Sequence, residues 1–159
     1  MPVDQPNDIV VLVIPLFDSR GNLPPGIHWT TWRQFAARFG WNGHRQTLLR
    51  GLRIVITGLR DSGCKAVYID GSFVTAKEMP GDFDSCWSIA GVDPELLDPA
   101  LLDFENERAG QKAKFRGEMF PAELPEGISG RTFLEFFQTD KATGLRKGII
   151  GMRLRRGKR

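Results

Sequence analysis

The stretch from Gly43 to Asp61 constrains the fold most, because only one kind of element fits its pattern. Its apolar residues recur at steps of three and four along the chain: Leu48, Leu49, Leu52, Val55, Ile56 and Leu59. This spacing is typical of an amphipathic helix that packs one face against a core. We therefore predict a long helix over residues 43–61, with Gly63 as its stop.

The segments around this helix predict a mixed fold. Further helices are expected over residues 30–39, capped by Thr30 or Thr31, and over residues 94–109 and 132–138. Strands are expected over residues 65–70, 82–90, 113–120 and 147–154. Residues 9–14 form either a buried strand or an extended arm. Together these segments predict an α/β (α+β) fold, a mixed β-sheet flanked by helices.

The composition predicts one globular domain over residues 1–159, with an N-terminal arm of about residues 1–28 and a basic C-terminal tail of about residues 153–159. Hydrophobic residues make up 41% of the chain and charged residues 26%, which excludes a disordered or collagen-like protein. The two cysteines, Cys64 and Cys86, form no CxxC motif, which favours a cytoplasmic setting. The longest apolar run, residues 9–14, is far shorter than the roughly 20 residues of a membrane helix, so we expect no membrane partner.

The positive net charge of the chain comes from its C-terminal end alone. The whole chain carries +3, but no acid follows Asp140, and the last 19 residues contain eight Lys and Arg. Residues 1–140 therefore carry a net −5. A basic tail of this kind could contact RNA phosphates, bind an acidic protein or remain disordered, and the acidic body predicts a different partner.

Two short motifs stand where predicted neighbouring strands end and begin. Gly71-Ser72 follows the apolar strand 65–70, and Asp82-Phe83-Asp84 begins the next strand after nine intervening residues. On a strand, Asp82 and Asp84 project to the same side, where two carboxylates repel each other unless a cation neutralises them. Carboxylate oxygens suit Mg²⁺ or Mn²⁺, and glycine lets the backbone approach a phosphate closely.

Each of these motifs has an ordinary structural explanation when it is taken alone. A Gly-Ser pair is usually a turn, and an Asp-x-Asp pair is usually a solvated strand edge. In this order, after an apolar strand, the two motifs together predict a nucleotide site of the kind used for phosphoryl or nucleotidyl transfer.

The segment from about residue 43 to residue 90 resembles the nucleotidyltransferase superfamily, of the polymerase-beta-like, minimal type, including a little-characterised bacterial group. The resemblance rests on Ile69-Asp70-Gly71-Ser72 and Asp82-Phe83-Asp84. It implies a magnesium-dependent enzyme that moves a nucleoside monophosphate from an NTP to a hydroxyl of a protein or RNA acceptor. It also implies a toxin–antitoxin or phage-defence setting, with a cognate partner protein or a homo-oligomer supplying acceptor recognition.

The resemblance assigns roles to particular residues. Asp82 and Asp84 would hold the metal, and Gly71 and Ser72 would contact the triphosphate. A third metal-binding acid is inferred to be Glu118, because it stands between small and apolar neighbours on a probable strand, with Glu123 and Asp103 as alternatives. Lys77 either reaches the β- and γ-phosphates or is a solvated loop lysine. Asp70 either braces the turn or faces the site.

Several other conspicuous residues are interpreted as structural. His28 and His44 lack the spacing of metal ligands, and Cys86 is expected to be a core thiol. The Trp and Phe residues at 29, 32, 41, 133, 136 and 137 are expected to form core rather than base-stacking platforms. Arg45, Arg50 and Arg53 are expected to form a solvated helix face, although they could reach phosphates.

Two rival functions remain open. One is a catalytically inactive, nucleotidyltransferase-like binding module that neutralises a partner protein, as an antitoxin does. The other is an RNA-binding protein that works through the basic tail.

Overall fold

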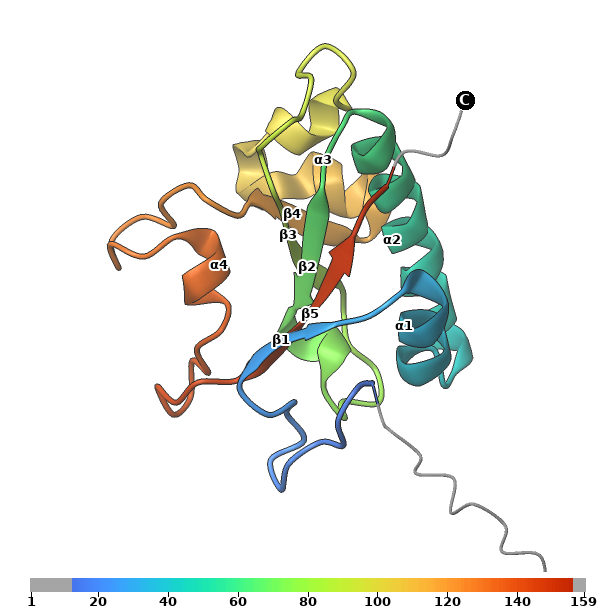
Figure 1. The fold of residues 1–159 in the computed structure, drawn as a ribbon, viewed down its shortest axis with the longest axis vertical. Helices are drawn as coiled ribbons and strands as arrows, with labels where there is room; N and C mark the ends of the chain where they lie inside the picture. Colours follow the sequence, from blue (N-terminus) through green and yellow to red (C-terminus); the bar gives the residue numbers. More distant parts are fainter. Residues whose placement is uncertain (1–12, 156–159) are drawn as a thin grey trace, which may run out of the picture.

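The structure, a computed structural model, describes residues 13–155 (Figure 1). Most of the segment 9–14 and the end of the tail lie outside this range. The strands are β1 (Gly26–Trp29), β2 (Ala66–Asp70), β3 (Phe83–Trp87), β4 (Gly117–Pro121) and β5 (Gly148–Arg153). The helices are α1 (Trp32–Phe39), α2 (Gly43–Asp61), α3 (Glu105–Phe115) and α4 (Phe133–Phe136), with short 3-10 helices η1 (Gly71–Val74) and η2 (Pro99–Leu102).

The five strands form one mixed sheet in the order β1-β5-β2-β3-β4. The central strand β2 runs antiparallel to both of its neighbours, β5 and β3, whereas the outer pairs β1–β5 and β3–β4 are parallel. A mixed sheet flanked by helices is the fold class that the sequence predicts, and the structure confirms it.

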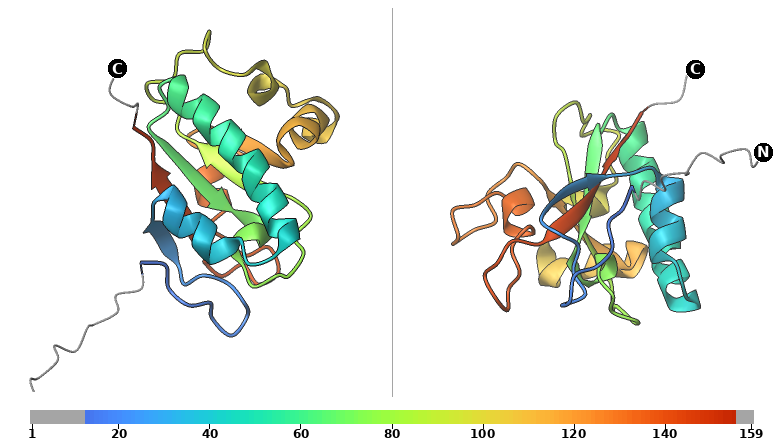
Figure 2. Two further views of the ribbon diagram at one scale, coloured as in Figure 1. Left: turned by 90° about the vertical axis from the view of Figure 1, so that its right-hand side faces the viewer. Right: turned by 60° about the horizontal axis from the view of Figure 1, so that its bottom comes forward.

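The two faces of the sheet are covered differently. Helices α1 and α2 lie against one face, as the side view in Figure 2 shows. The main hydrophobic core lies on this side, and it includes Val67, Ile69, Phe83, Ile150 and Met152. The other face carries a smaller cluster around Cys86 and Phe120, which the segment containing α4 partly covers. The remainder of this second face, towards β1 and β5, is called the open face below.

The predicted elements agree with the structure at most positions. The helix over residues 43–61 is confirmed with the same bounds, and Thr31 caps α1 through a capping box with Gln34. The predicted helix over 94–109 is wrong. Pro99 and the Asp98 side chain, which accepts from the amide of Ala100, instead start the separate helix η2, and α3 begins only at Glu105.

Two further boundaries differ from the expected ones. The helix α3 runs to Phe115, so only the second half of the predicted strand 113–120 is a strand. The N-terminal arm was expected over residues 1–28, but its described part, residues 13–28, packs against the domain. Ile14 and Leu23 are buried in the main core, and Gly26–Trp29 pairs with β5 as an edge strand. Within the described residues, no helix is long and apolar enough to cross a membrane.

Arg45, at the start of α2, does not belong to a solvated helix face as expected: its exposed fraction is 0%. Its guanidinium donates hydrogen bonds to four backbone carbonyls, at distances of 3.1 Å for Phe39, 2.6 Å for Phe73, 2.9 Å for Thr75 and 2.7 Å for Lys77. It also lies 3.6 Å from the ring centroid of Trp41. A buried charge is tolerated when its donors are all satisfied, and the planar guanidinium supplies enough of them.

Two residues near Arg45 in the sequence, Asn42 and His44, also form hydrogen bonds with the loop over residues 73–80. Asn42 Nδ2 donates to the carbonyl of Glu78 at 2.9 Å, and a ring nitrogen of His44 is hydrogen-bonded to the carbonyl of Pro80. The first turn of α2 therefore fixes the backbone between Phe73 and Pro80, which is the connection from Gly71-Ser72 to Asp82.

This arrangement predicts that Arg45→Lys destabilises the fold by about 2–4 kcal/mol, because an ammonium group cannot reach all four carbonyls and unpaired buried carbonyls are costly. Urea unfolding would measure the free energy of unfolding. The matched control is Arg50→Lys, at an exposed position on the same helix. Equal effects of the two substitutions would contradict the assigned role of Arg45.

Candidate active site

Gly71 forms the turn that places the end of β2 beside the acidic residues. Its φ of +72° lies in the left-handed region, which favours glycine. A Cβ atom at this position would lie 2.5 Å from Oδ2 of Asp84. A larger residue at position 71 would therefore displace the Asp84 carboxylate, so Gly71 and Asp84 form one structural unit.

Asp84 and Glu118 are brought together by strand register. They are direct partners in the parallel pair β3–β4, and Asp84 is also the direct partner of Asp70 in the antiparallel pair β2–β3. Side chains at paired positions point to the same face of a sheet. Three carboxyl groups from three neighbouring strands therefore lie in a row on the same face as the Cys86–Phe120 cluster.

The environment of Asp84 disfavours its charged form. Burial, followed by the charges of Asp82 and Glu118, raises the pKa of Asp84 to about 7. Burial also raises the pKa of Asp82, to which the charge of Glu118 adds. Acidic groups are therefore concentrated at this point of the sheet, in surroundings that favour their protonated forms.

Asp70 is completely buried, and its pKa is raised well above the usual value by burial and by the charge of Asp84. Its Oδ2 lies 3.9 Å from the Sγ of Cys86, whose own pKa burial raises as well. Its Oδ1 is buried and has no hydrogen-bond partner among the described residues. Cys86 is thus the core thiol that the sequence predicts, and Asp70 points into the face that carries Asp84.

Of the three acids in this row, Glu118 is the one that forms ion pairs with basic side chains. Its Oε1 lies 2.9 Å from Nζ of Lys112 and 3.3 Å from a guanidinium nitrogen of Arg108. Burial alone would raise the pKa of Glu118, but the hydrogen bond from Lys112 and the charge of Arg108 outweigh it and lower that pKa. Both cations come from α3, so this helix partly neutralises the site.

A cavity of about 340 Å³ opens beside Asp84 and Glu118. Two cations, Arg108 and Lys141, line it together with Glu126 and a group of aromatic rings: Phe104, Phe120, Phe133, Phe136 and Phe137. The sequence did not identify these rings as part of a site, because α4 follows β4 through a loop whose path no local pattern predicts. The stacked pair Phe120–Phe133, with ring centroids 4.7 Å apart, forms part of this lining.

The other residues proposed from the sequence lie near this cavity or away from it. Asp82 lines a neighbouring hollow of about 290 Å³ that also contains His44 and Lys112. Ser72 lies in η1, where its carbonyl accepts hydrogen bonds from Thr75. Lys77 is exposed, and its positive charge acts on Asp82.

The two alternative third acids lie elsewhere. Glu123 accepts hydrogen bonds from Ser88 and from the amide of Ile89, beyond the end of β3. Asp103 accepts from the amide of Glu105, at the start of α3. Among the acids considered from sequence, the structure brings Glu118 next to Asp84.

The donor atoms of the site suit Mg²⁺ or Mn²⁺, which prefer carboxylate oxygens. A cation bound here would give the unpartnered Oδ1 of Asp70 a partner, and it would favour the charged form of Asp84, whose pKa is raised. Within residues 13–155, no group of three or more His, Cys, Asp or Glu side chains is arranged as a metal-binding set. Lys112 and Arg108 both contact Oε1 of Glu118, so a metal bound to this oxygen would compete with the two cations.

The pKa of Asp84 predicts a pH-dependent stability. Its folded value of about 7 lies above the ordinary 3.8, so the folded state binds the proton more tightly and stability falls as pH rises from about 4 to about 7. Without added metal, Asp84→Asn should therefore stabilise the protein at pH 8 by about 2–4 kcal/mol and have little effect below pH 4. Thermal unfolding across this pH range measures it, with Glu95→Gln at an exposed position as control.

The comparisons with known proteins identify a family and nothing further. Neither the curated proteins nor the solved structures gave a match to the chain. The family described as a "Family of unknown function (DUF6932)" matches residues 15–153, which include all five strands and every residue of the site described above. The chain therefore belongs to the DUF6932 family.

Proposed function

We propose that the protein is a nucleotidyltransferase that depends on Mg²⁺ or Mn²⁺ and transfers a nucleoside monophosphate from an NTP to an acceptor hydroxyl. The observation that carries the proposal is the pairing of Asp84 with Glu118 on parallel strands, directly beside the Gly71 turn. A glycine turn, a row of carboxylates and an adjoining cavity are what a nucleotide and its metal require.

In this proposal Asp84 and Glu118 hold the metal, and Asp82, two residues before Asp84 in the chain, adds its charge to that of the pair. The bound metal would polarise phosphate oxygens and neutralise charge that develops during the transfer. Its binding would also favour the charged form of Asp84, whose pKa is raised by burial and then by the charges of Asp82 and Glu118. The backbone around Gly71 and Ser72 approaches the phosphates closely because residue 71 has no side chain.

The cavity beside Asp84 is proposed to hold the nucleotide. Its aromatic rings offer apolar surface to a base, and Arg108 and Lys141 offer positive charge to the phosphates. Lys77, in the loop held by Arg45, is placed to add charge near Asp82. In the reaction, the acceptor oxygen bonds to the α-phosphorus, the bond to the pyrophosphate oxygen breaks, and the hydroxyl proton leaves to solvent.

One observation favours a second candidate, the non-catalytic binding module. The ion pairs of Glu118 with Lys112 and Arg108 neutralise one acid of the row without a metal. A module of this kind would keep the fold and the cavity but would not turn over an NTP.

Incubation of the purified protein with α-labelled NTPs, Mg²⁺ and a cell extract tests transfer. We expect label on a protein or RNA acceptor with the wild type, and a loss of more than 100-fold with Asp84→Asn or with Glu118→Gln, because removing a metal ligand removes charge stabilisation of the transition state. Glu95→Gln, at an exposed position, is the matched control and should label normally.

Two results would separate the candidates. Labelling by the wild type that both site variants abolish supports transfer. If the wild type labels nothing, yet Mg²⁺ with an NTP raises its melting temperature and Asp84→Asn removes that rise, the protein is a nucleotide-binding module instead.

A further inference from the structure

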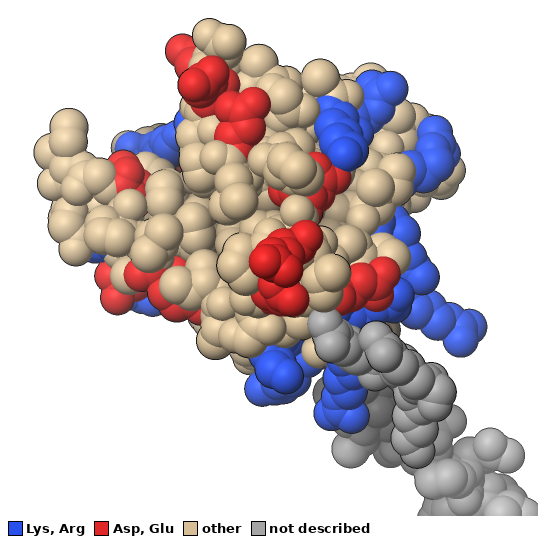
Figure 3. Space-filling model, turned by 90° about the horizontal axis from the view of Figure 1, so that it is seen from above, with Lys and Arg blue, Asp and Glu red and all other residues tan. Residues whose placement is uncertain are grey.

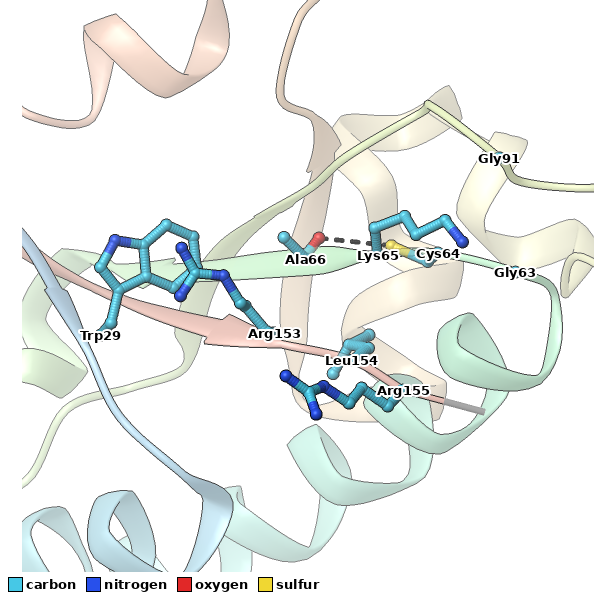
Figure 4. A pocket seen from close by; sticks show the side chains of 9 residues that line it. All are labelled: Trp29, Gly63, Cys64, Lys65, Ala66, Gly91, Arg153, Leu154 and Arg155. Atoms are coloured by element: carbon cyan, nitrogen blue, oxygen red, sulfur yellow. Dashed lines mark hydrogen bonds between the residues drawn. The ribbon is translucent and has the colours of Figure 1, made fainter. Parts of the chain in front are cut away.

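A second cavity, larger than the one beside Asp84, lies at the opposite end of β2 from the carboxylates. Its volume is about 620 Å³, and its walls come from the start of β2, the end of β5 and the end of β1. Figure 4 shows Arg153 beside the Trp29 ring, with Lys65 next to Cys64 on the side away from Trp29 and Arg155 below Leu154. The side chains of Trp29, Lys65, Arg153 and Arg155 are called the basic cavity group below.

A smaller hollow of about 210 Å³ lies against the same stretch of chain. Arg153 and Arg155 line both spaces, and the smaller one adds Arg53 and Arg60 from α2. None of the described residues that line either space is acidic. Arg60 has an ion pair with Asp61 at 3.3 Å, so the positive charge here rests chiefly on the other four cations.

Lys and Arg predominate along one side of this end of the molecule. Figure 3, which looks down from above, shows most Lys and Arg along the right-hand and lower edges and most Asp and Glu over the middle and left, although basic groups also lie at the upper left and an acidic group lies on the right. An anionic ligand with several charges is the complement of such a surface.

Aromatic rings beside these cations add a second kind of contact. The Arg153 guanidinium lies 4.3 Å from the Trp29 ring centroid, and Arg53 lies 4.9 Å from that of Trp32. Trp29 in turn meets Tyr68 edge-on at 5.7 Å, so aromatic surface continues along the open face. Guanidinium planes and aromatic rings both stack with nucleobases, and neighbouring cations bind the phosphates between them.

We propose that the basic cavity group binds single-stranded nucleic acid. Concave spaces of this size admit the bases of a flexible strand, which a base-paired duplex would keep inside its stack. An acidic protein segment would meet the positive charge but would not use the Trp29 surface.

The position of this surface suits an acceptor strand. Ala66 borders the basic cavity, and Asp70 lies beside Asp84. These two residues are four positions apart on β2, which corresponds to about 13 Å along a β-strand. Tyr68 lies between these two residues on the same face of β2, and its partly exposed ring extends the Trp29 surface towards the carboxylates. The acceptor role rests on the proposed transferase function, whereas the binding itself does not.

Fluorescence anisotropy of labelled oligo(U) and oligo(dT) with the full chain tests the binding. We expect Lys65→Gln/Arg155→Gln to weaken affinity at least fivefold and to reduce the slope of log affinity against log salt by about 1.4, the loss of two phosphate contacts. The control, Arg20→Gln/Arg50→Gln, removes two exposed positive charges that line neither space and should change affinity less than twofold.

Further variants separate the outcomes. Arg153→Gln, checked for folding by circular dichroism, should also weaken binding, and Glu95→Gln, at an exposed position that lines neither space, should not. The proposal is overturned if wild-type protein binds neither oligonucleotide, if the control pair weakens binding equally, or if polyglutamate competes as well as oligo(U).

Discussion

The buried guanidinium of Arg45 is the interaction on which the candidate site depends. It connects the end of α1, the 3-10 helix η1 and the loop after it through backbone carbonyls alone. Burial lowers the pKa of Arg45 to about 10, which still leaves it charged at neutral pH. Because the guanidinium donates to main-chain carbonyls, it fixes the backbone path of the loop between Gly71 and Asp82, and the charge of Glu78 in the same loop helps to keep Arg45 protonated.

The opposite electrostatic situation holds on the second face of the sheet. Arg45 is a buried cation whose donors are satisfied, whereas Asp70 and Asp84 are buried carboxyl groups with raised pKa values. A fold that keeps such groups together gives up stability at neutral pH. Perturbed carboxyl groups beside a cavity are a common property of functional sites, and this is the physical reason to place the function here.

The sequence predicted those parts of the structure that local patterns determine. The helix over residues 43–61 follows from its apolar spacing, and the motif Gly71-Ser72 with Asp82 and Asp84 follows from the order of strand and turn signals. The choice of Glu118 as partner of Asp84 rested on a short strand, and the register of β3 and β4 places the two side by side.

The parts that the sequence did not predict depend on contacts between distant segments. Arg45 stands three and four residues before Leu48 and Leu49, so helical spacing places it on the buried face of α2, whereas its charge led us to expect it in solvent. The loop over residues 73–80, which returns to the start of α2, supplies the carbonyls that satisfy the buried guanidinium. The aromatic wall of the cavity requires α4 to pack beside Phe120, which no periodicity in residues 122–132 indicates. Similarly, Trp29 meets Arg153 only because β1 and β5 pair in parallel.

The central claim is that Asp84 and Glu118 jointly bind a divalent cation with a nucleotide. A crystal structure of the protein with Mg²⁺ and a non-hydrolysable NTP tests it most directly. We expect Mg²⁺ at about 2.0–2.1 Å from an oxygen of each carboxylate, with Glu118 turned away from Lys112 and the triphosphate beside Gly71. A nucleotide bound elsewhere, or Glu118 still paired with Lys112 in the presence of both ligands, would contradict it.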